Sequence, residues 1–518
     1  MSRGVFQSHN KVGQETIFYV SGVTTFDPTI SITNSPKRRV HWDLGVSGTS
    51  YVATNLLSHS YTGSSSNYKS VKLKTNRLSS ITQLVANNDS IYNHLDLSNY
   101  SNLNSLIIGN NSNLTGITHT YNNQPFIYYD VQFCNLTNTL DLRQLTNLGG
   151  TLYLNNNTNL NYISHTASTQ IFTAYYAHFC GLKGNHDVSM LTNLGGVFEL
   201  SYNNQLTGVT HTYSNQIFNQ YQLIDCGLVG NHDISMFPNL GGGFSVSNNP
   251  LLKKIIHTAS TQVFYSYNVE YNGLVGNHDM SMLTNLGDTF AATNNPSLTA
   301  ITHTYSNQIF NVYTAILCGL KGNHDMSMFP NLGGSFTLRN NTNLTGITHT
   351  ASTQVFYNYD VHKCNLTGTH DISMLTNWVN GHISLMNNIN LTNVIFPLVT
   401  GGSFKNSGNI LSIGNTSISL YACNLGYINF LPLSAATMNV NSTYGAGINM
   451  IDNNLTPTEI NHILTDFNTI STLNPTGWSG VTLSILLANS SPDTTSGGYN
   501  GIAAINSLTG SPKNWIIT

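Results

Sequence analysis

The chain has 518 residues, of which only 8% are charged, and its formal net charge at pH 7 is −3. A chain of this length exceeds what one compact hydrophobic core usually holds, so it must form several domains or a repetitive architecture. The lack of a basic excess argues against nucleic acid as a partner. Because no run of about 18 apolar residues occurs, we expect no insertion into a membrane.

Residues 1–68 show no repeat. Short segments at 17–20, 29–33 and 40–44 alternate between apolar and polar residues, a pattern that predicts strands. Residues 60–68 are rich in Gly and Ser and are expected to form a junction. We interpret 1–68 as a small β-domain, either an attachment module or a cap over the first coil. Residues 1–10 lack the basic segment and apolar core of a secretory signal peptide, so we expect none.

From residue 111 to residue 374 the sequence repeats every 46 residues, a period typical of solenoids and other repeat arrays. One series of histidines is followed by Thr and the other by Asp, and members of each series are 46 residues apart: His119, His165, His211, His257, His303 and His349; His186, His232, His278, His324 and His370.

Each 46-residue unit divides into two 23-residue halves. Within each half an alternating apolar pair precedes an Asn or Cys and then a Leu, as in Tyr359, Val361, Cys364 and Leu366. This pattern resembles the leucine-rich repeat, L-x-x-L-x-L-x-x-N/C-x-L. The resemblance implies a mainly β leucine-rich-repeat solenoid, in which each coil adds one short strand to a parallel sheet. We expect irregular coils from 69, regular coils to about 400, and degenerate coils with a cap over 401–518.

The inward positions of the coils hardly vary. They predict one buried stack of Phe, another of Tyr, and an Asn at each bend that bonds backbone groups. The slot of this Asn holds Cys in the second half-repeat, and these thiols are expected to be free and buried because equivalent coils are too far apart for disulfides. The expected members are Phe126, Phe172, Phe218, Phe264, Phe310 and Phe356; Tyr129, Tyr175, Tyr221, Tyr267, Tyr313 and Tyr359; Asn157, Asn203, Asn249, Asn295 and Asn341; Cys134, Cys180, Cys226, Cys318, Cys364 and Cys423.

The C-terminal part contains a helix signal. Thr456, Pro457 and Glu459 form a capping box, and an apolar stripe follows them, so a helix of about three turns is predicted. Residues 502–508 are compatible with a short helix, and 481–487 and 515–517 with strands. This tail resembles the closing segment of leucine-rich-repeat proteins from phages that infect Bacteroidetes hosts.

The histidines do not predict a metal site, because equivalent residues two coils apart are about 10 Å from each other and a zinc ion needs three or four ligands around one point. We instead expect His186-Asp187 and its equivalents to bond backbone in turns on the convex side. We expect no cofactor and no catalytic centre, since no nucleophile elbow, zinc-protease motif or P-loop is present.

The outward positions of the strands vary freely, whereas the inward positions do not. Exposed positions drift without any function in many proteins, but solenoids also use such a sheet face for recognition. The predicted ligand-binding residues on this face are Tyr153, Tyr176, His178, Glu199, Gln222, Asn268, Glu270, Asp360 and His362. Tyr153 and Tyr176 are 23 residues apart and are expected to lie on adjacent strands as one aromatic platform with His178.

The resemblance and the uncharged surface together favour a non-catalytic phage structural protein, of tail- or head-fibre type, at a virion or extracellular surface. Its expected partners are a glycan or protein of the host surface, other virion proteins and a second copy of the chain. The alternatives are a bacterial surface adhesin, a capsid decoration protein and, less favoured, a glycan depolymerase.

Overall fold

The computed structural model describes residues 81–404, 417–438 and 447–518, and from residues 1–80 it describes the backbone of six strands. The chain divides into two compact units, Met1–Gly242 (unit 1) and Gly243–Thr518 (unit 2). Both units are built mainly from short strands with coils of about 23 residues, as the repeat predicts.

Unit 1 begins with antiparallel strands. β1 pairs with β6, and β6 also pairs with β3, so β6 is not the first strand of a coil as its sequence suggested. The alternation in β6 fits either arrangement, because both types of strand have a period of two residues. The predicted strands at 17–20, 29–33 and 40–44 are present, whereas the junction at 60–68 lies outside the described residues. The strands of this part are β1 (Gln14–Val20), β2 (Thr29–Ile32), β3 (Val40–Asp43), β4 (Thr49–Val52), β5 (Leu56–Ser58), β6 (Lys69–Thr75), β8 (Ile91–Leu97) and β10 (Asn113–His119).

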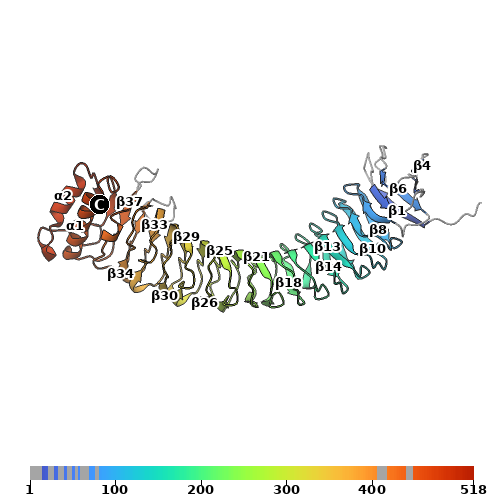
Figure 1. The fold of residues 1–518 in the computed structure, drawn as a ribbon, viewed down its shortest axis with the longest axis horizontal. Coiled ribbons are helices and arrows are strands. Elements are labelled where there is room, and N and C mark those ends of the chain that lie inside the picture. Colours follow the sequence, from blue (N-terminus) through green and yellow to red (C-terminus); the bar gives the residue numbers. More distant parts are fainter. Residues whose placement is uncertain are drawn as a thin grey trace, which may run out of the picture. The chain divides into compact units, whose positions relative to one another are not determined.

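Parallel pairing starts at β7, which pairs with β9, and each later coil of unit 1 adds one strand to this main sheet. Figure 1 shows these strands on one side of the coils and the back strands on the other side. The main sheet of unit 1 comprises β7 (Ile81–Val85), β9 (Ser105–Ile107), β11 (Phe126–Asp130), β13 (Leu148–Tyr153), β15 (Phe172–Tyr176), β17 (Gly196–Glu199) and β19 (Phe218–Gln222). Its back strands are β12 (Asn138–Asp141), β14 (Leu160–Ser164), β16 (Lys183–Asp187), β18 (Gln205–Thr210) and β20 (Gly230–Asp233).

Unit 2 repeats this arrangement, and β21 (Leu240–Ser245) contains the boundary between the units. Its main sheet comprises β23 (Phe264–Asn268), β25 (Leu286–Ala291), β27 (Phe310–Thr314), β29 (Leu332–Thr337), β31 (Phe356–Asp360), β33 (Trp378–Ser384), β36 (Ile418–Ser419), β38 (Gly447–Asn449), β39 (Thr482–Ser484) and β40 (Ile516–Ile517). The other strands are β22 (Leu252–Ile256), β24 (Gly276–Asp279), β26 (Leu298–Thr302), β28 (Lys321–Asp325), β30 (Asn343–Thr348), β32 (Thr367–Asp371), β34 (Asn390–Ile395), β35 (Ser403–Phe404) and β37 (Thr437–Met438).

The predicted inward positions form the core. The Phe and Tyr residues of both expected stacks are buried. Asn157 Nδ2 donates to the carbonyl oxygens of Val131 at 2.9 Å and Leu154 at 2.7 Å. Cys180 uses the same slot, since its Sγ donates to the Leu154 carbonyl oxygen at 3.2 Å. All six cysteines are free and buried, which confirms the expected ladder.

The two histidine series occupy the core. Tyr175 Oη lies 2.9 Å from Nε2 of His165 and 2.9 Å from Nε2 of His186. The same histidine–tyrosine triad recurs at His211, Tyr221 and His232, and again at His303, Tyr313 and His324. The expectation that His186 lies in an external turn is therefore wrong: position 186 is the inward residue of back strand β16. The expectation holds for Asp187, whose Oδ1 accepts from the Ser189 backbone N–H at 2.9 Å.

A helical cap closes unit 2. The capping box at Thr456 and Glu459 is present, and α1 (Pro457–Leu473) runs longer than predicted because Ile470 extends its buried stripe. A second helix, α2 (Gly501–Thr509), forms where the sequence was only compatible with one. Two short 3-10 turns, η2 (Leu431–Leu433) and η3 (Ser496–Gly498), complete the cap. Neither helix of the described residues is long and apolar enough to span a lipid bilayer.

Candidate functional site

The predicted outward residues of unit 1 form one row across the main sheet. Tyr153 on β13 is the register partner of Tyr176 on β15. Tyr176 pairs in turn with Glu199 on β17, and Glu199 with Gln222 on β19. The 23-residue spacing thus placed these four side chains correctly side by side.

The two tyrosines form the expected aromatic platform. Their ring centroids are 5.0 Å apart and their planes differ by 5°, whereas Tyr128 is tilted against Tyr153 at 5.6 Å. Burial raises the pKa of Tyr176, with smaller contributions from the neighbouring Tyr153 and Glu199. The Tyr176 phenol is therefore neutral at physiological pH and can both donate and accept hydrogen bonds.

His178 extends this platform. Its ring stands at 89° to that of Tyr176, with centroids 6.2 Å apart. Its Nδ1 lies 3.5 Å from Oε2 of Glu199, a distance that suits an ion pair when the imidazole is protonated but gives no hydrogen bond here. The site thus combines flat aromatic surface with one carboxylate beside it.

Sequence reasoning missed a second row of residues beside the sheet. At the turn after each main strand one residue has a positive φ, and in several coils this residue is Asn, as at Asn156 with φ of 62°. Phe179 and Tyr202 occupy the same position with φ of 51° and 61°. The sequence contained a signal for Tyr202, which interrupts a series of Asn at 46-residue intervals, whereas the series of Phe179 in the other half-repeat contains no Asn.

The face of unit 2 has different chemistry. Asn268 turns its side chain back and accepts from the Glu270 backbone N–H at 2.9 Å. The residues that follow Asn268 in register are Ala291, Thr314 and Thr337, and none of them is aromatic. The outward row therefore carries rings in unit 1 and small side chains in unit 2.

Asp360 and His362 were expected to be exposed, but both are buried, with only 6% and 9% of their surfaces accessible. Asp360 Oδ1 lies 2.6 Å from His362 Nδ1, and its Oδ2 lies 3.7 Å from Nη1 of Arg339. The two side chains are buried because they satisfy each other beside Arg339 instead of pointing to solvent. They are therefore poor candidates for ligand contacts.

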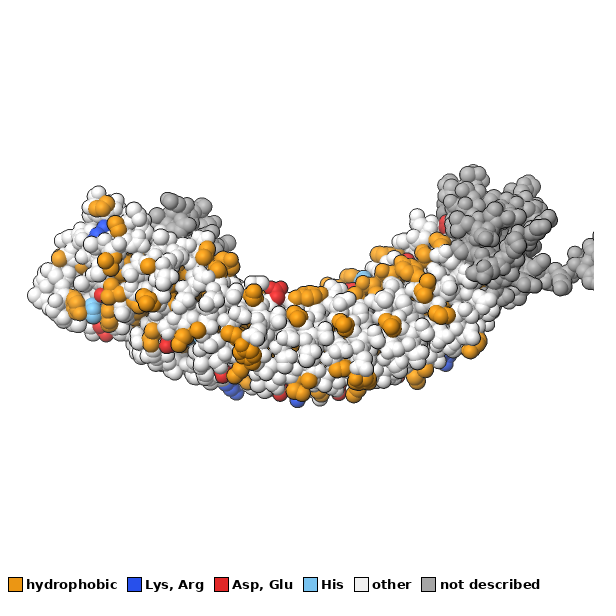
Figure 2. Space-filling model, viewed as in Figure 1, with side chains coloured by type: hydrophobic (Ala, Val, Ile, Leu, Met, Phe, Trp, Pro, Cys, Tyr) orange, Lys and Arg blue, Asp and Glu red, His pale blue; other side chains and the backbone are white. Residues whose placement is uncertain are grey.

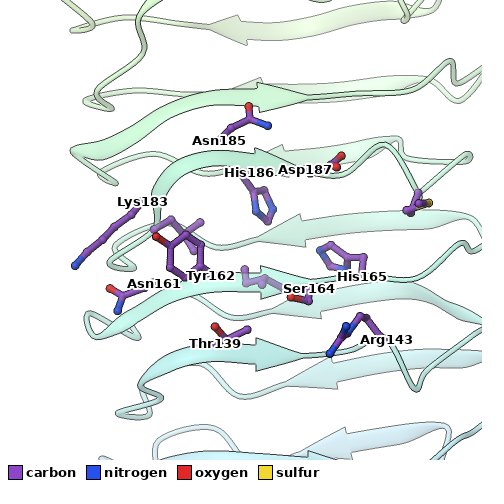
Figure 3. A pocket seen from close by; sticks show the side chains of 13 residues that line it. Thr139, Arg143, Asn161, Tyr162, Ser164, His165, Lys183, Asn185, His186 and Asp187 are labelled. Carbon is purple, nitrogen blue, oxygen red and sulfur yellow. The ribbon is translucent and has the colours of Figure 1, made fainter.

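A cavity of about 420 Å³ lies on the opposite side of unit 1, between back strands β14 and β16 (Figure 3). His165, His186 and Asp187 line it together with Asn185. Both imidazoles already bond Tyr175, and burial lowers the pKa of His165 to about 3 and that of His186 to about 4. Asn185 Nδ2 donates to Thr210 Oγ1 at 2.7 Å. Several polar groups of this cavity are thus already paired, which favours a structural role.

No group of three or more His, Cys, Asp or Glu side chains in the described part of the chain is arranged to hold a metal ion. Comparisons of the sequence with models of known protein families and with curated proteins gave no match. The geometry of the sheet face and the pattern of the repeat are therefore the features from which a function can be inferred.

Proposed function

We propose that this protein is a non-catalytic structural component of a phage particle, of tail- or head-fibre type, and that it binds the host cell surface through the outward row of unit 1. The stacked pair of Tyr153 and Tyr176 carries this proposal. The repeat and the C-terminal tail resemble those of leucine-rich-repeat proteins of phages, which supports a role in a phage particle. The surface chemistry supports a contact with the host cell surface.

The surface around the row suits contact with an uncharged partner. Figure 2 shows mainly uncharged side chains on the visible face, with hydrophobic side chains scattered among them. Tyrosine supplies a large, rigid contact area at low cost in conformational entropy, and its hydroxyl bonds polar groups of a partner. Neither tyrosine belongs to the inward positions that stay nearly constant between the repeats, so the fold does not require an aromatic ring at either place.

Substituting both tyrosines by threonine tests the proposal, because Thr337 and Thr314 occupy the equivalent outward positions of unit 2. Threonine keeps the preference for a strand. We expect Tyr153→Thr with Tyr176→Thr to reduce adsorption of labelled protein or particles to host cells at least about tenfold, since central aromatic residues dominate binding energies. The melting temperature should fall by only a few degrees, through loss of the stacked pair.

The matched control is Thr314→Ser with Thr337→Ser on the face of unit 2, which keeps both hydroxyl groups and should leave adsorption unchanged. Equal adsorption by the tyrosine variant and the wild type would refute the proposed contact. Loss of adsorption in both variants would show that the face of unit 1 has no special part in it.

A further inference from the structure

The positive-φ row of unit 1 holds large residues at a position that disfavours them. A left-handed backbone is unfavourable for residues other than glycine, and Asn tolerates this region better than Phe or Tyr. Phe133, Phe179 and Tyr202 nevertheless adopt φ of 53°, 51° and 61°. The half-repeats equivalent to that of Tyr202 make the same turn with Asn156 or Asn248, and those equivalent to Phe179 make it with Asp225 or Lys363, so an aromatic ring is not needed for the turn.

The core does not gain from these side chains. Phe133, Phe179 and Tyr202 remain 47%, 44% and 42% exposed to solvent. Strained backbone and exposed rings both reduce stability, and such strain is typically found at functional sites. Tyr271 and Leu317 of unit 2 share this combination, so a ligand is indicated only where the turn rings also join the rings of the sheet.

The rings of the turn continue the platform of the sheet. Phe179 and Tyr202 stack with centroids 4.3 Å apart and planes within 2° of each other. The ring centroids of Phe179 and His178 are 5.7 Å apart, and those of His178 and Tyr176 are 6.2 Å apart. Tyr153, Tyr176, His178, Phe179 and Tyr202 thus form one continuous surface, which we call the aromatic ridge.

The polar groups beside the ridge indicate what it would bind. Glu199 lies next to His178, and Asp225 occupies the turn position one coil beyond Tyr202. These carboxylates accept hydrogen bonds from hydroxyl groups and repel anions. A neutral sugar presents C–H groups that suit aromatic rings and hydroxyl groups that suit carboxylates and phenols.

We propose that the aromatic ridge is a binding site for a neutral, hexose-containing glycan. This inference rests on the proposed function and names the class of ligand for the same face. The rings contact the apolar faces of the sugar units, Glu199 accepts from their hydroxyls, and the phenols of Tyr153, Tyr176 and Tyr202 donate to or accept from them. The negative charge of Glu199 and Asp225 disfavours an acidic glycan.

The test replaces Phe179 and Tyr202 by Asn, the residue that stands at the turn position of Tyr202 in the other repeats. We expect Phe179→Asn with Tyr202→Asn to unfold at the same temperature as the wild type or a higher one, since Asn relieves the backbone strain. The full chain is assayed by microscale thermophoresis or surface plasmon resonance against mannan, amylopectin, a β-glucan and a galactan as neutral polysaccharides. Dextran sulfate and hyaluronate serve as the acidic counterparts.

The wild type should bind at least one neutral polysaccharide and neither acidic one, and the Asn variant should bind the same polysaccharide at least tenfold more weakly. The control is Tyr271→Asn in unit 2, whose tyrosine has φ of 55° and is 54% exposed. This control should bind like the wild type.

Binding to none of the neutral polysaccharides, a preference for the acidic ones, or unchanged binding by the Asn variant would overturn the inference. If these results occur while the double tyrosine-to-threonine variant still loses adsorption to host cells, the proposed function stands with a protein partner in place of a glycan. If that variant adsorbs normally, the proposed function itself fails.

Discussion

Units 1 and 2 share their core but differ on the face of the main sheet. Tyr175 in unit 1 and Tyr313 in unit 2 each lie between two histidines, with nearly identical distances. On the outward side, the stacked Tyr153 and Tyr176 of unit 1 correspond to Thr337 and Thr314 of unit 2. The comparison teaches that the coil fixes its interior and leaves its surface free to acquire a function in one segment alone.

Acid should affect the shared core most strongly. Tyr175 Oη–H can donate to only one Nε2, so the other histidine must donate to the tyrosine oxygen. Nδ1 of His165 is buried without a partner, and an unpaired lone pair is tolerated better than an unpaired N–H. We therefore assign His165 as the Nε2–H donor and His186 as the acceptor. Protonation of His165 would then add an unpaired N–H in the interior, and protonation of His186 would break its bond with Tyr175.

The sign of the pH effect follows from these groups. Burial lowers the pKa of ten core histidines in the folded chain, for example to about 4 for His232 and His324, from 6.5. The unfolded chain binds the protons, so stability is complete above pH 6.5 and falls as the pH decreases toward 4. Within this window each such histidine lowers the free energy of unfolding by about 1.4 kcal/mol for every unit by which the pH decreases.

We expect cooperative unfolding between pH 6.5 and 4, with uptake of several protons, when circular dichroism is followed during acid titration. His165→Val, Tyr175→Phe and His186→Val together should shift the transition to lower pH, because Val188, Phe198 and Val209 occupy these positions one coil later. Full stability at pH 4.5 in the wild type would contradict this account of the core.

The equivalence of the two cores can be tested by smaller changes. Tyr175→Phe leaves both partner imidazoles without their hydrogen bond and should lower the free energy of unfolding by about 1–3 kcal/mol. Tyr313→Phe should lower it by the same amount, since its surroundings repeat those of Tyr175. The measurement is urea unfolding of both variants. Markedly different losses would show that the two units do not share one core.

The difference between the faces predicts a gain of function. Thr314 and Thr337 are register partners on β27 and β29. Thr314→Tyr with Thr337→Tyr should build a second stacked pair, which contributes about 0.5–1.5 kcal/mol at most to stability. This variant should raise adsorption to host cells or, in a chain that carries the Tyr153→Thr and Tyr176→Thr substitutions, partly restore it. No recovery would mean that His178 and the turn residues are needed beside the tyrosines.

The sequence predicted those features that depend on residue type and spacing. Asn157 and Cys180 could be placed in one buried slot, and Tyr153 beside Tyr176, because a 23-residue coil repeats each environment. The role of His186 was misjudged, since a five-residue back strand is too short to reveal which of its residues points inward. Asp360 and His362 are buried because they contact each other and Arg339. A repeat pattern does not predict pairwise contacts of this kind. The strained backbone at Phe179 could be recognised only from its φ angle, which the sequence does not give.

The short reach of the core contacts has a genetic consequence. The hydrogen bonds of Tyr175 with its two histidines and those of Asn157 with the backbone join residues at most 26 positions apart. Recombination that deletes or duplicates a whole 46-residue segment would therefore recreate the core contacts at the new joint. A change of 23 residues would instead join two half-repeats of the same kind and leave a tyrosine without one of its histidines. Related genes should accordingly differ in length by multiples of 138 base pairs, the coding length of one 46-residue segment.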